Sequence, residues 1–319
     1  MSNPKIIIIT QGLSPIVPPI TDKYSVVGIV EAAPRKKHNS TEGRLIKLSR
    51  WLYRLVNLRS KSLQSFCGES GIPYYLMNAG SDKSLGDWVI DKAPDLLCIY
   101  SMSELLQENI FSIPPLGTIN LHPSLLPKYR GPNPYFWIIL NEETESGPTI
   151  HYIDKDEDTG DILAQEAFTL CREATITEIQ SQTVALGVQL MIKIIDRLSN
   201  GCAEPIKQPQ KSPTARARLV KPDEYYGLIQ WEQWSVQRIW RLFHSGAFRL
   251  SDVFPNISGA RWKECEPMAL ESMPRKKARQ VPGTLSLESG VYVLSCMDGV
   301  ILFKGHYGFK QILSKLIGR

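Results

Sequence analysis

The chain of 319 residues lacks any run of 18 apolar residues, the length that a membrane-spanning helix needs. At the amino terminus a single Lys precedes the short apolar run 6–9, and no cleavage motif of a secretory signal follows. The sequence therefore predicts a protein that does not associate with membranes and that is located in the cytoplasm.

Cysteine and histidine are scarce, with six and five residues respectively. The cysteines are spread without pairs, which is typical of reduced thiols rather than a disulfide framework. His122, His151 and Asp154 are candidate metal ligands by residue type, but they lack the compact spacing of a zinc site. We therefore expect no metal.

Two glycine motifs that mark common enzyme classes are also missing. The segment after the first expected strand carries Gly12 and then prolines, so it has no Gly-x-Gly-x-x-Gly pattern for a dinucleotide. Ser124 is not flanked by the Gly-x-Ser-x-Gly elbow that exposes a hydrolase nucleophile. We interpret Ser124 as a loop residue.

What the first 200 residues do contain is an alternation of apolar strands with amphipathic helices. This alternation is typical of an α/β fold, here a Rossmann-like and mostly parallel sheet covered by helices. We assign residues 1–200 to a catalytic domain of this class. The expected strands are 5–10, 26–31, 73–76, 94–100 and 117–121, and the expected helices are 60–70, 85–92 and 175–198.

The chain is longer than one hydrophobic core usually supports, so a second domain is expected. The polar and proline-rich stretch 201–222 is typical of a linker. Residues 223–319 then form the second domain, which we predict to be a helix followed by a small, OB-like β-barrel. The helix is expected at 230–244 and the strands at 281–285, 291–296 and 300–304, with a hairpin turn at Asp298-Gly299.

Three polar side chains are expected to meet at the end of one strand. Asn120 and His122 are two residues apart on a strand and therefore share a face. Ligands bind at the carboxyl ends of strands in open α/β sheets, which is where this pair lies. Asp158 follows in an acidic loop between the apolar runs 149–153 and 162–164, from which it can fold back over the strand end.

An amide, an imidazole and a carboxylate suit the attack of an amine on an acyl carbon. Asn120 is expected to donate a hydrogen bond to the developing oxyanion, a contact worth about 2.7 to 4 kcal/mol in the transition state. His122 donates alongside it, while Asp158 orients the imidazole and helps to accept the amine proton. No covalent nucleophile is needed.

The order and spacing of three elements resemble the folate-dependent formyltransferases, a family that includes glycinamide ribonucleotide formyltransferase, methionyl-tRNA formyltransferase and the nucleotide-sugar N-formyltransferases. The elements are Asn120-x-His122, Ser124-Leu-Leu-Pro127-x-x-x-Gly131 and Asp158-Thr-Gly160-Asp161-Ile162, and the resemblance is strong over roughly residues 90–200. It implies that Asn120, His122 and Asp158 are catalytic and that the donor is 10-formyltetrahydrofolate. It further implies that the folate lies against Tyr100, Ser101, Met102, Ser103, Leu105, Asp154 and Glu157.

The acceptor of the formyl group is harder to predict. Residues 201–319 hold 18 basic and 10 acidic residues, against 19 and 22 in residues 1–200, and the basic second part is similar to that of methionyl-tRNA formyltransferases. Those enzymes carry a Gly- and Arg-rich insertion after the second strand, a pattern that 34–44 does not match. We therefore favour a nucleotide-linked amino sugar as the acceptor. Basic side chains would hold the diphosphate of such a molecule. The expected acceptor-binding residues are Arg35, Lys128, Arg130, Asn133 and Trp137.

Three alternatives stay open from the sequence. The first is a methionyl-tRNA formyltransferase that acts on initiator tRNA, for which the basic run 275–279 is a candidate contact. The second is a formyltetrahydrofolate hydrolase, in which the same three side chains direct water. The third is a protein that binds folate or RNA without catalysis. The sequence does not predict the amino position, the oligomeric state or the role of the second domain.

Overall fold

A computed structural model describes residues 3–32, 62–77, 83–102, 104–255, 264–272 and 280–306. The chain divides into two compact units. The first unit contains Met1–Pro132, Gly147–Ala167 and Gln182–Arg216, and the second contains Asn133–Ser146, Phe168–Ser181 and Ala217–Arg319. Each unit is therefore assembled from more than one stretch of the sequence.

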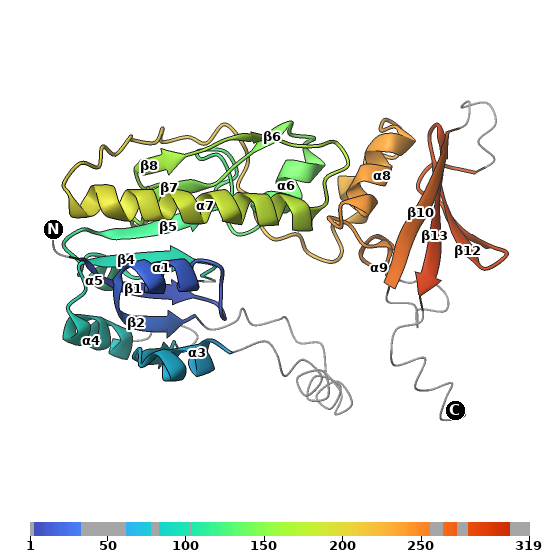
Figure 1. The fold of residues 1–319 in the computed structure, drawn as a ribbon. Helices are drawn as coiled ribbons and strands as arrows, with labels where there is room; N and C mark the ends of the chain where they lie inside the picture. The colour runs from blue at the N-terminus through green and yellow to red at the C-terminus, as the bar shows by residue number, and fades with distance from the viewer. Residues whose placement is uncertain are drawn as a thin grey trace, which may run out of the picture. The chain divides into compact units, whose positions relative to one another are not determined.

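A seven-stranded sheet in the order β3-β2-β1-β4-β5-β7-β8 forms the centre of the first unit (Figure 1). The strands from β3 to β5 run parallel, and β7 and β8 are antiparallel. This order confirms the predicted Rossmann-like sheet. The strand bounds are β1 (Lys5–Thr10), β2 (Ser25–Glu31), β3 (Tyr74–Leu76), β4 (Leu96–Tyr100), β5 (Thr118–His122), β7 (Thr149–Tyr152) and β8 (Ile162–Gln165).

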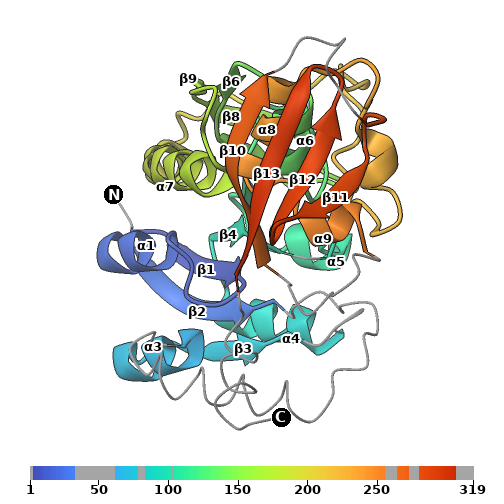
Figure 2. The ribbon, with the colours of Figure 1, turned by 90° about the vertical axis from the view of Figure 1, so that its right-hand side faces the viewer.

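Helices cover both faces of this sheet because its central strands are apolar on both sides. The alternate residues of β1 divide between two cores, with Ile6 and Ile8 in one and Ile7 and Ile9 in the other. The first core contains residues of α1 (Val17–Lys23), α3 (Leu63–Ser70) and α7 (Ile176–Ser199). The second contains residues of α4 (Lys83–Lys92) and α5 (Glu108–Phe111), on the other side of the strands (Figure 2).

The strand that carries Asn120 and His122 has a helix pressed closely against its other face. A Cβ built on Gly187 of α7 would lie 2.5 Å from Cδ1 of Leu121, so the helix backbone approaches β5 more closely than a larger residue allows. Leu121 is buried in the same core as Met191 and Ile194 of the helix. The close packing keeps one face of β5 apolar and leaves the opposite face for the polar residues.

The second unit contains a four-stranded antiparallel sheet in the order β10-β13-β12-β11. The ring of Phe243 on α8 meets that of Phe303 on β13, with the ring centroids 5.0 Å apart. The sheet is consistent with the small barrel-like module expected. The bounds are α6 (Pro134–Leu140), β6 (Glu145–Ser146), β9 (Phe168–Thr169), η1 (Tyr226–Leu228), α8 (Val236–His244), α9 (Leu250–Val253), β10 (Glu264–Ser272), β11 (Leu285–Glu288), β12 (Val291–Cys296) and β13 (Gly299–His306).

Two expected elements of the second unit begin later than their sequence pattern suggested. The helix expected from residue 230 starts at Val236, because the Ser235 hydroxyl accepts a hydrogen bond from the backbone N–H of Arg238 and so caps the helix there. The strand expected at 281–285 is found at Leu285–Glu288, because a turn with Gly283 at φ +84° precedes it. The structure also contains α6 and β10, which we did not predict.

The stretch expected to be a linker has fixed partners in the first unit. Ile206 and Ile162 exchange two backbone hydrogen bonds of 2.7 and 2.8 Å, and Gln208 is only 8% exposed. Residues 201–216 group with the first unit, and Ala217 begins the final segment of the second. The domain bounds at 200 and 222 stay a prediction. No helix within the described residues has the length and apolar character to cross a membrane.

Candidate active site

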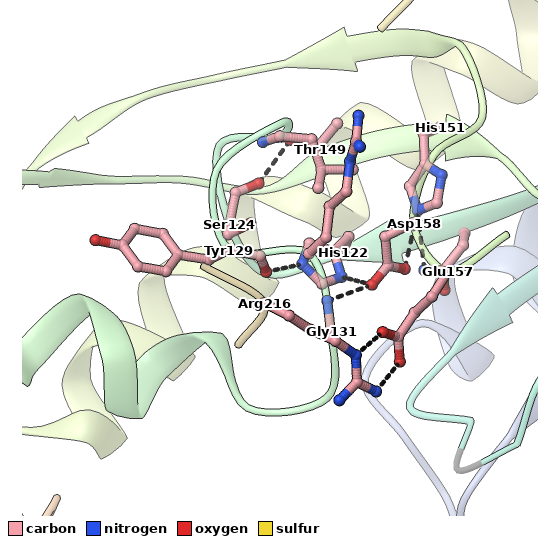
Figure 3. A network of polar contacts seen from close by, with 12 residues as sticks. His122, Ser124, Tyr129, Gly131, Thr149, His151, Glu157, Asp158 and Arg216 are labelled. Carbon is pink, nitrogen blue, oxygen red and sulfur yellow. Dashed lines mark hydrogen bonds and ion pairs between the residues drawn. The ribbon is translucent and has the colours of Figure 1, made fainter. Parts of the chain in front are cut away.

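Two neighbouring strands present the polar face of the site. In the antiparallel pair of β5 and β7, Asn120 lies directly opposite His151 and His122 lies directly opposite Thr149. Residues opposite one another in such a pair share a face of the sheet, so both histidines and Asn120 project to the same side. The rings of His122 and His151 lie edge to face, with their centroids 6.2 Å apart (Figure 3).

Asp158 reaches the two histidines from the acidic loop. Its Oδ2 lies 3.5 Å from Nδ1 of His122, and its Oδ1 lies 3.7 Å from Nε2 of His151 (Figure 3). The backbone N–H of Gly131 donates to Oδ2 over 2.8 Å, which ties the carboxylate to the loop that follows β5. Asp158 itself has φ +55°, a left-handed conformation that its surroundings must stabilise. The structure thus brings together the three side chains that the sequence predicted to be catalytic.

The contacts of His122 define the orientation of its ring. Nε2 lies 3.0 Å from the carbonyl oxygen of Tyr129, and because a carbonyl only accepts, Nε2 carries a hydrogen and donates it. The other ring nitrogen, Nδ1, faces Asp158. His122 is only 4% exposed. The Tyr129 carbonyl therefore fixes the ring so that Nδ1 points at the carboxylate of Asp158.

His151 is a site residue whose role sequence reasoning missed, since we considered it only as a metal ligand. Its Nδ1 donates to the carbonyl of Tyr152 over 2.8 Å, so Nε2 accepts the 3.1 Å hydrogen bond from Nδ2 of Asn120. Burial lowers the pKa of His151 to about 4, which keeps the ring neutral at neutral pH. His151 thereby fixes which way the Asn120 amide points. The alternation of Thr149, Ile150 and His151 was the signal that could have placed it on this face.

Ser124 is held by structural contacts. Its side chain is completely buried and its hydroxyl donates to the carbonyl of Lys128 over 2.7 Å. The hydroxyl of Thr149 donates in turn to the carbonyl of Ser124 over 2.6 Å (Figure 3). These contacts fix the loop after β5, and they agree with the interpretation of Ser124 as a loop residue.

The segment expected to hold the folate follows β4, the parallel neighbour of β5. Tyr100 ends β4 and is 9% exposed, and Ser101 has φ +61°. Met102 packs against the second core of the sheet, whereas Leu105 is 64% exposed. Ser103 lies outside the described residues. An exposed leucine after the strand next to β5 is suited to contact an apolar ring, but the folate contacts stay a prediction.

The acidic loop offers the other residues expected to contact the folate. Oδ1 of Asp154 accepts hydrogen bonds from the backbone N–H of Asp156 and the hydroxyl of Thr159, so it shapes the loop from within. Glu157 forms a two-pronged ion pair with Arg216, in which Nη2 donates to Oε1 over 2.8 Å (Figure 3). Hydrogen bonding to Glu157 raises the pKa of Arg216. Both carboxylates therefore have partners within the first unit.

The residues expected to bind the acceptor fall in different parts of the chain. In the first unit, Lys128 is partly buried and Arg130 is 9% exposed, with its guanidinium donating to the carbonyls of 209 and 210 and to Gln208. In the second unit, Trp137 donates from Nε1 to the carbonyl of 218 over 2.8 Å. Asn133 precedes α6 in the same unit, and Arg35 lies outside the described residues. Their role in acceptor binding stays a prediction.

Metal ligation finds no support within the described ranges. They hold no group of three or more His, Cys, Asp or Glu side chains arranged to bind a metal ion. The two histidines of the site instead contact a carbonyl oxygen each, one the carbonyl of Tyr129 and the other that of Tyr152.

Comparison with known proteins shows which family the chain belongs to. Residues 59–195 match the model of the formyl transferase family. A methionyl-tRNA formyltransferase of Roseiflexus castenholzii is 33% identical over 236 residues, which are 73% of this chain and 72% of that protein. The chain belongs to the formyl transferase family. Its chemistry is folate-dependent formyl transfer, and the resemblance of the residues 90–200 to that family is confirmed.

Solved structures of this formyltransferase's fold cover both of its units. The crystal structure of WlaRD, a sugar 3N-formyl transferase, has a TM-score of 0.61 and 18% identity, and the match covers 97% of this chain and 100% of that one. The N-formyltransferase of Helicobacter canadensis has a TM-score of 0.60 and 17% identity, covering 95% and 99%. At these identities the likeness shows the fold, and the fold includes the second unit.

Proposed function

We propose that this protein transfers the formyl group of 10-formyltetrahydrofolate to a primary amine, with Asn120, His122 and Asp158 as the catalytic residues. The observation that carries the proposal is their convergence on one face of β5, where the Asp158 carboxylate lies 3.5 Å from His122. Each of the three side chains has a fixed orientation, set by His151, Tyr129 and Gly131 respectively. Such preorganisation is what lowers the barrier of acyl transfer.

The proposed reaction needs an oxyanion donor and a proton acceptor. The amine nitrogen forms a bond to the formyl carbon, and the carbonyl oxygen takes up negative charge. Nδ2 of Asn120 gives one hydrogen to His151 and directs its second to that oxygen. The proton lost by the nitrogen passes to the pair formed by Asp158 and Nδ1 of His122. The bond between the formyl carbon and N10 of the folate then breaks, N10 takes up the proton, and tetrahydrofolate and the formamide are released.

For the acceptor we propose the amine of a nucleotide-linked amino sugar. Support comes from the two solved structures matched over nearly the whole chain, one obtained in the presence of dTDP and the other in complex with dTDP-3-aminofucose. Lys128 lies on the loop that follows β5, where a basic side chain suits a diphosphate. The basic segment 34–44 also departs from the insertion expected of a tRNA enzyme.

Methionyl-tRNA is the second candidate, and two observations favour it. The relative at 33% identity is named a methionyl-tRNA formyltransferase, an identity higher than the 17% and 18% found with the sugar enzymes. The excess of 18 basic over 10 acidic residues in 201–319 suits a polyanion as well. This candidate shares the donor and the catalytic residues with the first.

One assay distinguishes these candidates. Tetrahydrofolate release from 10-formyltetrahydrofolate is followed with the pure protein alone, with methionyl-tRNA and with a panel of amino-sugar nucleotides. We expect release only when an amino-sugar nucleotide is present, and its loss in the variants His122→Ala and Asp158→Asn. Release with tRNA alone would transfer the proposal to the second candidate, whereas release without an acceptor would indicate a hydrolase. No release under any condition would contradict the proposal.

A further inference from the structure

A segment with the composition of a linker contacts two loops that lie beside the proposed catalytic residues of the first unit. We call residues 206–216 the strap. On the loop that follows β5, the hydroxyl of Ser212 donates to the carbonyl of Pro127 over 2.6 Å, and the hydroxyl of Thr214 accepts from the backbone N–H of Tyr129 over 2.7 Å. The strap also contacts the acidic loop that carries Asp158. It therefore joins two loops that are distant in sequence.

The side chain of Gln208 is the point at which the strap holds both loops at once. Its Nε2 donates to the carbonyl of Asp158 over 3.1 Å and to the carbonyl of Gly160 over 2.6 Å. Its Oε1 accepts from Nε and Nη2 of Arg130 over 3.3 and 2.9 Å. One buried amide thus makes four hydrogen bonds, two to the acidic loop and two to the loop after β5.

This set of partners requires a primary amide at the length of glutamine. Two carbonyls need two N–H donors, and a guanidinium needs an acceptor, which no other neutral side chain of this size provides. A glutamate would keep the bond to Arg130 but would turn a carboxylate toward the carbonyls of Asp158 and Gly160. An apolar residue would leave all four partners without this bond. The bonds matter because Asp158 is held in a left-handed conformation that is costly for a residue other than glycine.

We propose that Gln208 is a positioning residue for the transfer reaction. Its amide clamps the backbone of Asp158 and Gly160 to Arg130 and so positions the Asp158 carboxylate against His122. The inference rests on the proposed function of Asp158. The carboxylate lies 3.5 Å from His122, a separation that a small shift of the loop would change. A displacement of about 1 Å at a reacting group costs on the order of 100-fold in rate.

The test uses three variants of the whole chain. Gln208→Met removes all four hydrogen bonds at a similar side-chain volume, and Gln208→Glu keeps only the bonds to Arg130. Gln210→Met makes the same chemical change two residues away, where the side chain is exposed and only the backbone carbonyl accepts from Arg130. For each folded variant, kcat and the donor KM are measured with the acceptor that the wild type uses.

We expect Gln208→Met and Gln208→Glu to lower kcat by about 10- to 100-fold while the donor KM changes less than about threefold. The KM is spared because Asp154 and Glu157 are held by other contacts. Gln210→Met should behave as the wild type. The inference is overturned if Gln208→Met keeps kcat within twofold, or if Gln208→Glu restores it, since then bonding to Arg130 alone suffices.

A second measurement is independent of turnover. The N–H of Gly131 donates to Asp158, so its hydrogen exchange reports the position of the carboxylate. We expect Gly131 to lose protection in Gln208→Met and to keep it in Gln210→Met. Equal protection in both would overturn the positioning role even if the wild type proved inactive with every acceptor. Inactivity of the wild type would count against the proposed function alone, so the two failures are distinguishable.

Discussion

At the scale of single residues, the neutral His151 beside His122 and Asp158 does most to define this site. His151 is fully buried, and it accepts a hydrogen bond from Asn120 only while its Nε2 carries no proton. Protonation of His151 would turn that acceptor into a donor and would bring a positive charge beside His122. The low pKa of His151 therefore preserves the orientation of Asn120.

The lowered pKa of His151 predicts a loss of stability in acid. The unfolded chain takes up a proton at this histidine near pH 6.5, whereas the folded protein does so only near pH 4. The contribution of neutral His151 to the free energy of unfolding is therefore present above pH 6.5 and is lost as the pH drops toward 4. We expect the wild type to lose about 2 kcal/mol more than His151→Gln between pH 7.5 and pH 5. Urea unfolding of both proteins at the two pH values measures this, and equal losses would contradict it.

Asn120 is predicted to act in the transition state. Asn120→Ala removes the oxyanion donor, and kcat should fall by about 10²- to 10³-fold with little change in the donor KM. Ser124→Ala is the matched control, because the Ser124 hydroxyl donates to the carbonyl of Lys128 and is buried away from solvent. We expect it to cost about 1 kcal/mol of stability and to keep turnover. Steady-state kinetics on both variants decide whether the amide or the hydroxyl is required.

At the scale of elements, the backbone of the acidic loop passes very close to the backbone at the end of β7. A Cβ on Gly160 would lie 1.9 Å from the carbonyl oxygen of Tyr152, a backbone atom that cannot move aside. We expect Gly160→Ala to lower the free energy of unfolding by about 3 kcal/mol and to reduce turnover by displacing Asp158. The control is Gly68→Ala on α3, where a Cβ meets nothing within 4 Å and should stabilise the helix by about 0.5 to 1 kcal/mol. Thermal unfolding of the two variants should shift in opposite directions.

The elements that the sequence predicted well are those whose signal is local. The period of two within β5 placed Asn120 and His122 on one face, and apolar spacing predicted α7 to within one residue at each end. His151 was missed as a partner of Asn120 because the pairing of β5 with β7 joins residues 31 apart in sequence. Local periodicity carries no information on which strands pair.

The strap shows a second limit of the same kind. Its prolines and polar residues have the composition of a linker, yet Gln208 is buried and bonds to residues 48 to 78 positions earlier in the chain. Composition indicates how a segment behaves when it makes no tertiary contacts. It could not predict that the carbonyls of Asp158 and Gly160 would meet a glutamine amide. A smaller error of prediction occurred at α8. The capping residue Ser235 lies within the amphipathic stretch and makes the helix begin at Val236.

At the scale of the whole molecule, the residues proposed to be catalytic lie in one unit, whereas those expected to bind the acceptor fall in both. Asn120, His122 and Asp158 all belong to the first unit, as do the expected acceptor residues Lys128 and Arg130. The expected acceptor residues Asn133 and Trp137 belong to the second. The second unit draws on the middle of the chain as well as on its carboxyl-terminal part. If Asn133 and Trp137 bind the acceptor as predicted, changes to them should alter acceptor use and leave the catalytic residues of the first unit in place.

The basic run 275–279, which lies outside the described residues, provides a test of the acceptor at this scale. Replacing its four basic residues with glutamine removes charge that a tRNA would use, but none that a small sugar nucleotide needs. We expect kcat/KM with the amino-sugar nucleotide to change less than about twofold between 50 and 200 mM salt in both wild type and variant, since few phosphates are bound. If tRNA is instead the acceptor, transfer should fall steeply in the variant, and the salt dependence that remains should be weaker than that of the wild type. The variant keeps Asn120, His122 and Asp158, so a change in transfer reports on the acceptor rather than on the catalytic residues.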